Sequence, residues 1–277
     1  MIRGSTRLIA HIGFPTHGFR SPMIYNPYFE EAGIDAVVVP MGCEAQHYPA
    51  LLQSLFKLTN ICGALITMPH KVSTVALLDE ASPAVHIAGA CNAVRRGDDG
   101  RLVGDMFDGE GFVRGMRRKG CDPAGQRALI VGSGGVGSAI AAALAAAGVA
   151  ALSLFDTNPV AAPALVRRLR ARYPLLAITS DSNDPAGYAI VVNATPMGMN
   201  DGDPLPLDIG RVARDAFVGE VVMQRETTAF LAAARARGCQ TQVGSDMLFE
   251  QIPAYLEFFG LPSTTPEHLR SVARLEA

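Results

Sequence analysis

The sequence predicts two α/β domains, because apolar strand-like segments alternate with helix-like segments in two separate blocks. The first block runs from the N-terminus to Met106, and the second begins at Arg127. The chain has 277 residues, which suits two medium-sized domains with well-buried cores. We expect ligands to bind in a cleft where the two domains meet.

The first block contains three strand-like segments, each followed by a segment with helical spacing of apolar residues. The expected strands are 6–14, 34–42 and 63–68, and the expected helices are 21–32, 48–60 and 71–81. Ser21 is expected to cap the first helix, with Pro22 at its first position. Residues 92–106 read as a hairpin with Asp99 and Gly100 in the turn.

The second block repeats this alternation and ends in an amphipathic helix. Its expected strands are 127–132, 151–156, 188–195, 217–222 and 239–244, and its expected helices are 133–148, 158–173, 227–238 and 245–260. We place the first domain at residues 1–108, completed by the C-terminal helices 245–277. The second domain is expected over 109–244.

Charge and cysteine content exclude several classes of protein. The net charge is -2, which gives no basic surface for nucleic acid or an anionic membrane. The five cysteines are scattered, odd in number and without a C-x-x-C pair, so we expect no disulfide framework and a cytoplasmic location. The six histidines show no ligand spacing, so no metal is expected. The longest apolar run, 139–155, is too short to span a membrane.

A glycine-rich loop follows the first strand of the second block and opens a helix. Its residues are Gly132, Ser133, Gly134, Gly135, Val136 and Gly137. The G-x-G-x-x-G spacing in this context is typical of a Rossmann-type dinucleotide-binding domain. Its glycines permit a tight turn, close approach of a pyrophosphate, and close packing of helix on strand. The pyrophosphate would lie at the helix N-terminus.

A carboxylate, Asp156, lies at the end of the next strand, about 20 residues beyond the last glycine of the loop. A carboxylate there accepts hydrogen bonds from the adenosine ribose and repels the 2′-phosphate of NADP. The nearest basic residues, Arg167 and Arg168, lie well along the following helix. We therefore expect NAD to be preferred over NADP, with a helix-capping aspartate as the alternative interpretation of Asp156.

A lysine follows the third strand of the first block. Pro69 cannot donate to a sheet, so the chain leaves the sheet there and places Lys71 beyond the strand's carboxyl end. Ligands of open α/β sheets bind at such ends. These residues alone favour a solvated lysine on the first turn of a helix, and an ammonium directed into a cleft is the alternative.

Short motifs in a fixed order resemble the shikimate/quinate dehydrogenase family along nearly the whole chain. They are "SP" at 21–22, "T-x-P-x-K" at 67–71, "GA-x-N" at 89–92, "GD-x-x-DG" at 104–109, the glycine loop, "NATPMGM" at 193–199, and a glutamine in the last long helix. No single fragment is decisive, but the ordered set is specific. We identify the chain as a divergent member of the family.

The resemblance implies roles in the first block. Lys71 and Asp108 correspond to the catalytic pair, in which the lysine takes the hydroxyl proton while hydride leaves the same carbon. The implied substrate-binding residues are Ser21 for the carboxylate, and Thr67, Asn92 and Gln251 for ring hydroxyls. Without the resemblance, Asn92 reads as a strand-end amide and Gln251 as a helix-surface residue.

The resemblance also implies cofactor contacts outside the glycine loop. Residues 193–199 would line the cofactor cleft near the nicotinamide, through Thr195, Pro196 and Met199. Gly244 would contact the nicotinamide side through its backbone.

The departures from the family pattern lie in the substrate half. The family usually has a second hydroxyl residue at the place of Phe19, and often has Asn at the place of Leu65. It often has Asn-Thr where this chain has Met106 and Phe107, and a tyrosine where it has Met223. Each change replaces a polar group with an apolar one, so we expect a substrate other than ordinary shikimate.

These observations predict an NAD-dependent oxidoreductase of the shikimate/quinate dehydrogenase type, acting on a ring hydroxyl of a cyclic hydroxy carboxylic acid. The alternative is an NAD-binding regulatory protein of the same fold without turnover. The expected partner is a small-molecule cyclic hydroxy acid, with no nucleic acid and no membrane, and a homodimer is left open.

Overall fold

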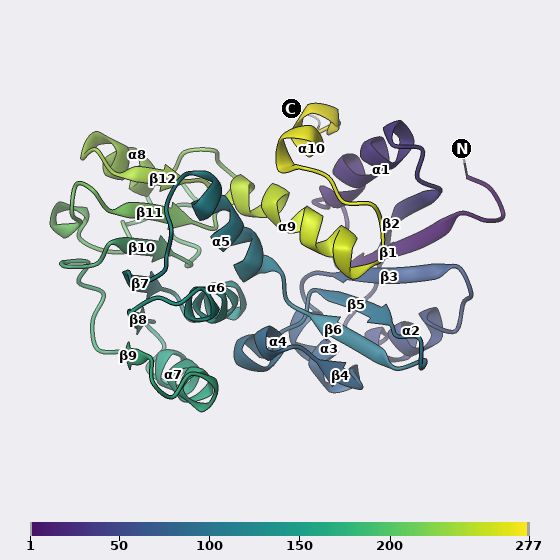
Figure 1. Cartoon of the computed structure of the whole chain (residues 1–277), viewed down its shortest axis with the longest axis horizontal. Helices are drawn as coiled ribbons and strands as arrows, with labels where there is room; N and C mark the ends of the chain where they lie inside the picture. Colours follow the sequence, from purple (N-terminus) through teal and green to yellow (C-terminus); the bar gives the residue numbers. More distant parts are fainter. Residues whose placement is uncertain (1, 276–277) are drawn as a thin grey trace. The chain divides into compact units, whose positions relative to one another are not determined.

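The computed structural model describes residues 2–275, which fall into two compact units. Within the described residues, the first unit comprises 2–107 and 252–275, and the second comprises Asp108–Gln251. Each unit is built around its own six-stranded sheet (Figure 1). The predicted α/β class, with two separate blocks of strands and helices, is confirmed.

The first unit has a mixed sheet with strand order β2-β1-β3-β5-β6-β4. Its strands are β1 (Arg7–Gly13), β2 (Ala36–Gly42), β3 (Ile61–Ile66), β4 (Glu80–Ala81), β5 (Ala93–Arg96) and β6 (Leu102–Asp105). Its helices are α1 (Ser21–Glu31), α2 (Tyr48–Leu55), α3 (Lys71–Thr74), α4 (Pro83–Ala88) and α10 (Pro266–Val272). β1 pairs in parallel with β2 and β3, and β5 and β6 form the predicted antiparallel hairpin.

The outer edge of β2 is held by a side chain of α1 instead of by another strand. Asn26 donates through Nδ2 to the Val38 carbonyl at 3.0 Å and accepts from the Val38 N–H through Oδ1 at 2.8 Å. The next residue on that side of the strand is Pro40, which has no N–H. The side-chain amide therefore satisfies the backbone groups that an edge strand would leave unpaired.

Two local expectations for the first unit were wrong. Ser21 is the first residue of α1 and not its cap, because Arg20 occupies the N-cap position and no side chain caps the helix. The expected helix over 71–81 is a single turn, α3, continued by a 3-10 turn over Val75–Leu77. It ends there because the chain must reach β4, which pairs with β6.

The second unit has a fully parallel sheet with strand order β12-β11-β10-β7-β8-β9, drawn from top to bottom in Figure 1. Its strands are β7 (Arg127–Val131), β8 (Ala151–Phe155), β9 (Ala177–Thr179), β10 (Ile190–Asn193), β11 (Phe217–Glu220) and β12 (Gln240–Gln242). Its helices are α5 (Asp108–Arg118), α6 (Gly135–Ala146), α7 (Ala161–Arg172) and α8 (Ala229–Ala236), and a 3-10 turn covers Ile209–Arg211. The order reverses between β7 and β10, which is where a doubly wound sheet opens to a ligand.

Helix α5 was missed because glycines interrupt its pattern, and those glycines are required by packing. A Cβ at Gly109 would lie 2.0 Å from the carbonyl oxygen of Ala139 in α6, and a Cβ at Gly115 would lie 2.9 Å from the Gln242 side chain. The glycines therefore allow α5 to approach α6 and β12 closely. Helix α9 (Gly244–Phe258), the predicted amphipathic helix, begins in this unit and ends in the first.

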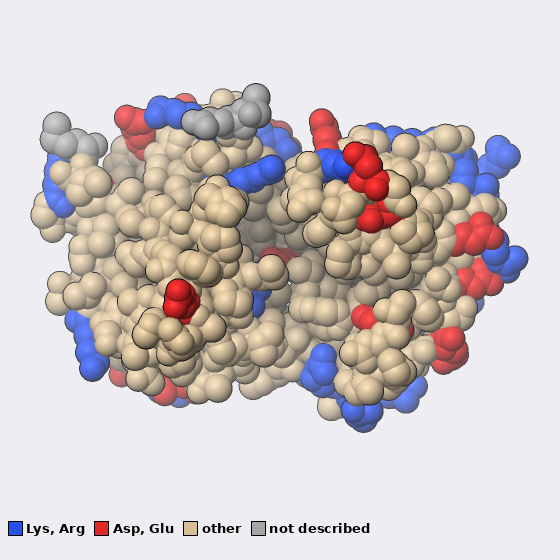
Figure 2. All heavy atoms as spheres, turned by 180° about the vertical axis from the view of Figure 1, so that it is seen from behind, with Lys and Arg blue, Asp and Glu red and all other residues tan. Residues whose placement is uncertain are grey.

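The surface carries mixed charges. On the face drawn in Figure 2, basic and acidic side chains are scattered among one another. Within residues 2–275, no helix is long and apolar enough to cross a membrane. Across the same residues, no cluster of three or more His, Cys, Asp or Glu could hold a metal ion. All five cysteines are free thiols.

Candidate functional site

A cavity of about 860 Å³ opens at the carboxyl ends of β7 and β10 in the second unit. Most of the predicted cofactor residues line it: Gly132, Gly134, Gly135, Val136, Asp156, Thr195, Pro196 and Met199. Ser133, Gly137 and Gly244 are not among its wall residues. The cavity lies at the reversal point of the sheet, which is the position where dinucleotides bind this fold.

The glycine loop has the geometry that its spacing predicts. Gly132 has φ 104°, and a Cβ there would lie 2.6 Å from the Ala194 carbonyl oxygen. A Cβ at Gly137 would lie 2.0 Å from the Gly132 carbonyl oxygen, so only glycine lets α6 approach the loop. Gly134, in contrast, has open space where a Cβ would be, and it stands at the N-cap of α6 without a side-chain cap. This cradle fits the pyrophosphate of a dinucleotide.

The Asp156 carboxylate accepts hydrogen bonds from two backbone N–H groups. Oδ2 accepts the Ser133 N–H at 2.6 Å, and Oδ1 accepts the Asn158 N–H at 2.8 Å. The carboxylate therefore fastens the glycine loop to the end of β8. It does not cap α7, because the N-cap of that helix is Val160.

The loop after β10 is held by a buried amide, Asn193. Its Nδ2 donates to the Met197 carbonyl at 3.0 Å, and its Oδ1 accepts the Thr195 N–H at 3.1 Å and the Thr195 hydroxyl at 2.6 Å. These bonds fix the backbone of the segment that forms one wall of the cavity. Asn193 belongs to the "NATPMGM" motif, but the sequence analysis predicted no role for it.

A buried acid, Glu220, supports this amide from the neighbouring strand. Glu220 is 0% exposed, and the Thr228 hydroxyl donates to its Oε2 at 2.8 Å, while its Oε1 has no partner among the described residues. Burial raises its pKa to about 7, although hydrogen bonds from Thr228 and Asn193 and the charge of Arg235 lower it. The sequence signal for this residue is an acid ending an otherwise apolar strand, β11, which sequence reasoning passed over.

Gly244 is explained by packing at the start of α9. A Cβ there would lie 2.1 Å from the Val222 carbonyl oxygen. Gln251, further along α9, is buried, with an Oε1 that has no partner among the described residues. The alternative interpretation of Gln251 as a helix-surface residue is therefore wrong.

In the first unit, the turn after β3 carries Thr67 and Lys71. The Thr67 N–H donates to the Ile12 carbonyl at 2.9 Å, which keeps this residue attached to β1 beyond the end of β3. Lys71 begins α3, and its carbonyl accepts the Cys91 N–H at 2.8 Å. The lysine backbone is thus tied to the segment that contains Asn92.

Asn92 is buried and has a structural hydrogen bond. Its Oδ1 accepts the Phe107 N–H at 2.9 Å, immediately before Asp108. The amide thus positions the chain that leads to the predicted catalytic aspartate. Asp108 is buried at the first position of α5, the first residue of the second unit, and Lys71 belongs to the first unit.

His70, next to the lysine, is a packing residue. Its ring stacks on Tyr48 with centroids 4.0 Å apart and an interplanar angle of 8°, and its Nε2 lies 2.8 Å from the Cys43 carbonyl oxygen.

Three of the apolar departures from the family pattern pack inside the first unit. Leu65 and Met106 are buried, and the half-buried Phe107 ring packs edge-on against Tyr255 and Phe258. Phe19 differs, because its ring tip would lie 2.9 Å from a Cβ at Gly13. The Thr67 methyl would lie 2.4 Å from the same point, so Phe19 and Thr67 meet over Gly13.

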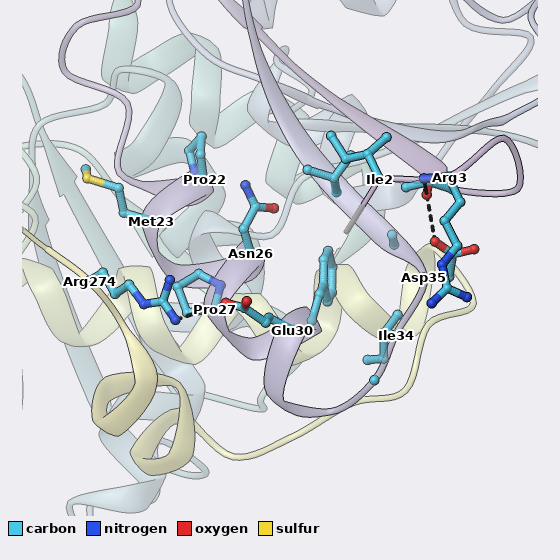
Figure 3. Close-up of a pocket in the computed structure, with 15 residues that line it drawn as sticks. Ile2, Arg3, Pro22, Met23, Asn26, Pro27, Glu30, Ile34, Asp35 and Arg274 are labelled. Carbon is cyan, nitrogen blue, oxygen red and sulfur yellow. Dashed lines mark hydrogen bonds and ion pairs between the residues drawn. The ribbon is translucent and has the colours of Figure 1, made fainter.

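A second cavity, of about 500 Å³, lies between α1 and the start of β2 in the first unit (Figure 3). Two of its acids have partners, since Arg274 donates to Glu30 at 2.9 Å and the Thr6 hydroxyl donates to Asp35 at 2.7 Å. None of the predicted site residues lines it.

The comparisons with known proteins agree with the two-unit architecture. The model of the shikimate dehydrogenase substrate binding domain matches residues 12–94, and the ThiF family model matches residues 124–173. Shikimate dehydrogenase (NADP(+)) of Acidiphilium cryptum (strain JF-5) is 35% identical, covering 99% of this chain and 98% of the relative. The enzyme of the same name from Rubrobacter xylanophilus is 35% identical over 90% of this chain and 89% of the relative.

The chain belongs to the shikimate dehydrogenase family. Among solved structures, shikimate 5-dehydrogenase from Listeria monocytogenes in complex with shikimate and NAD is similar, with a TM-score of 0.91 and 27% identity. The alignment covers 98% of this chain and 97% of that one. The resemblance inferred from the ordered motifs is thereby confirmed.

The expected preference for NAD over NADP is contradicted. The curated shikimate dehydrogenase relatives carry NADP(+) in their names. The inference rested on Asp156 facing the ribose, whereas the carboxylate accepts hydrogen bonds from the backbone of Ser133 and Asn158. Because these hydrogen bonds give Asp156 a structural role in the loop, its presence does not indicate a preference for NAD over NADP.

Proposed function

We propose that this member of the shikimate dehydrogenase family moves hydride between a nicotinamide dinucleotide and a ring hydroxyl of a cyclic hydroxy carboxylic acid. The observation that carries the proposal is the cavity at the reversal point of the parallel sheet, with the glycine cradle at its base. Family membership supports an oxidoreductase of CH–OH groups. The names of the curated relatives favour NADP as the dinucleotide.

The cofactor cradle is proposed to consist of the loop 132–137 and the segment 193–199. The N–H groups at the start of α6 would hold the pyrophosphate, because the helix has no side-chain cap to satisfy them. The Asn193 amide would keep the second segment in place, since it bonds to both Thr195 and Met197. The bound nicotinamide supplies the two-electron chemistry, accepting or giving a hydride.

The substrate residues are proposed from the family motifs. Lys71 would take the proton of the reacting hydroxyl during oxidation and return it during reduction, and Asp108 would orient the amine. Ser21 would bind the carboxylate. Thr67, Asn92 and Gln251 would bind ring hydroxyls, with Asn92 also fixing the backbone before Asp108.

The test is steady-state turnover of a panel of cyclic hydroxy acids, including shikimate, quinate and less hydroxylated analogues, with NADP and with NAD. Lys71→Ala is the diagnostic variant, and Lys57→Ala, at an exposed lysine after α2, is its matched control. We expect turnover of at least one acid by the unmodified protein and by the control, and its loss in Lys71→Ala. Tight dinucleotide binding without turnover of any acid would favour a regulatory protein of the same fold.

A further inference from the structure

We propose that His11 contacts the substrate and donates a hydrogen bond to its carboxylate, in place of the hydroxyl residue that the family has at the position of Phe19. This inference rests on the proposed function, which supplies the cyclic hydroxy acid. It assigns a role to a residue that no motif of the sequence marks.

The sheet register places His11 beside one of the apolar departures from the family pattern. His11 on β1 is in register with Leu65 on β3, and the strands are parallel. Register partners on neighbouring strands direct their side chains to the same face, and residues two apart on a strand share a face. His11 therefore shares its face with Leu65, where the family often has a polar amide.

The loop before α1 fixes the imidazole. The Phe19 ring stacks on the His11 ring with centroids 4.0 Å apart and an interplanar angle of 26°. The tip of the same phenyl ring lies over Gly13, where it meets the Thr67 methyl. Phe19 precedes Ser21 by two residues, so the imidazole stacks on the loop that leads to the proposed carboxylate-binding serine.

The imidazole is buried and incompletely satisfied by the protein. His11 is 7% exposed, and its Nδ1 is fully buried with no hydrogen-bond partner among residues 2–275. Buried polar atoms of this kind are rare in folded proteins. Burying Nδ1 without a partner costs less free energy when this nitrogen is a bare acceptor than when it carries a proton. The ring therefore favours the tautomer with its proton on Nε2.

The His11 ring is neutral in the protein without a ligand. Burial, with a smaller contribution from the charge of Lys71, lowers its pKa to about 4, so the ring is neutral near pH 7. A neutral ring still donates one hydrogen bond. A carboxylate bound beside it would also offset the effect of Lys71 and raise the pKa of the imidazole.

The His11 imidazole thus supplies a polar group close to two positions where this chain lacks the polar residues of the family. Phe19 and Leu65 remove a hydroxyl and an amide from the family pattern, and His11 lies against the first and opposite the second. The stack also presents an apolar ring beside the imidazole. The substrate class is therefore a cyclic acid with its carboxylate on the imidazole and an apolar edge against Phe19.

The experiment compares His11→Val with His11→Gln, which keeps a side-chain donor, and with His86→Val at an exposed helix position as the control. Dissociation constants for shikimate, quinate and less hydroxylated cyclic acids are measured by calorimetry, and KM and kcat with saturating NADP. Removing one hydrogen bond to a carboxylate should raise KM and Kd of the preferred acid about 10- to 100-fold. The kcat value should stay within about threefold, because His11 does not exchange the reacting proton.

Three further measurements distinguish recognition from packing. An analogue of the preferred acid that lacks the carboxylate should bind His11→Val and the unmodified protein alike, and His11→Gln should recover part of the lost affinity for the acid. In the unmodified protein, proton NMR should show the pKa of His11 rising when the acid binds. The NMR measurement needs no variant, so it tests whether His11 contacts the acid even if His11→Val fails to fold.

The outcomes separate this inference from the proposed function. Turnover with an unchanged KM in His11→Val, or a His11 pKa that does not respond to the acid, overturns the inference and leaves the function standing. Binding of a cyclic acid without turnover, weakened in His11→Val, supports the inference and overturns the function. Absence of both binding and turnover with every acid overturns both.

Discussion

The buried acid Glu220 predicts a pH-dependent stability of the second unit. Glu220→Gln replaces an ionisable group by an isosteric neutral one and keeps an oxygen that can accept from Thr228. Burial raises the folded-state pKa of Glu220 from 4.5 to about 7. At about 1.4 kcal/mol per pH unit, this interval corresponds to about 3 kcal/mol of unfolding free energy.

The sign follows from the protons that each state binds. Below pH 4.5 the carboxyl is protonated in both the folded and the unfolded protein, so ionisation costs nothing. As the pH rises, the unfolded chain ionises first, and the folded state loses stability until the pH passes about 7. The glutamine variant has no such loss. Relative to the unmodified protein, we therefore expect Glu220→Gln to gain about 3 kcal/mol between about pH 4.5 and pH 8.

The assay is urea unfolding at about pH 5 and pH 8, with hydrogen exchange of β11 peptides to assign the change to the second unit. Glu226→Gln, at an exposed acid a few residues away, is the control and should show the same pH dependence as the unmodified protein. Parallel stability profiles for Glu220→Gln and the unmodified protein would refute the assignment of a raised pKa to this carboxyl.

Three other substitutions test the site. Lys71→Ala should lower kcat about a hundredfold or more, the usual scale for a positioned acid–base group, and leave dinucleotide binding unchanged; undiminished turnover would remove the lysine from the mechanism. Gly137→Ala places a Cβ 2.0 Å from the Gly132 carbonyl oxygen, so we expect about 1–3 kcal/mol of lost stability and weaker dinucleotide binding by calorimetry. Equal melting temperature and affinity would contradict that geometry. Asn193→Ala removes the bonds to Met197 and Thr195, and should raise the dinucleotide Kd; an unchanged Kd would show that the segment holds its shape without the amide.

The fold was predictable because its signals are local. Alternating apolar segments identified both sheets, and the spacing of Gly132, Gly134 and Gly137 placed the turn between β7 and α6. The antiparallel hairpin followed from Asp99 and Gly100 for the same reason. Helix α5 was missed because its glycines lower helix propensity, and only the packing of α5 on α6 shows why they are there.

The parts that could not be predicted depend on contacts between distant segments. The position of Asp156 at the end of a strand was predictable, but its hydrogen bond to the Ser133 N–H was not. The cofactor preference inferred from Asp156 was therefore wrong. Likewise, nothing in the sequence pairs His11 with Phe19, since their stacking arises from the path of the loop before α1. Such contacts are decided by tertiary structure and not by spacing along the chain.

The side-chain clamp of Asn26 on β2 has a consequence for self-association. Incoming strands bind a sheet through its unpaired edge groups, and here the amide of α1 and the proline of β2 leave little for them to bind. The opposite edge of the same sheet is β4, which has only two residues. Neither edge of this sheet therefore offers a template for an incoming strand, so copies of this chain would not join through the sheet of the first unit.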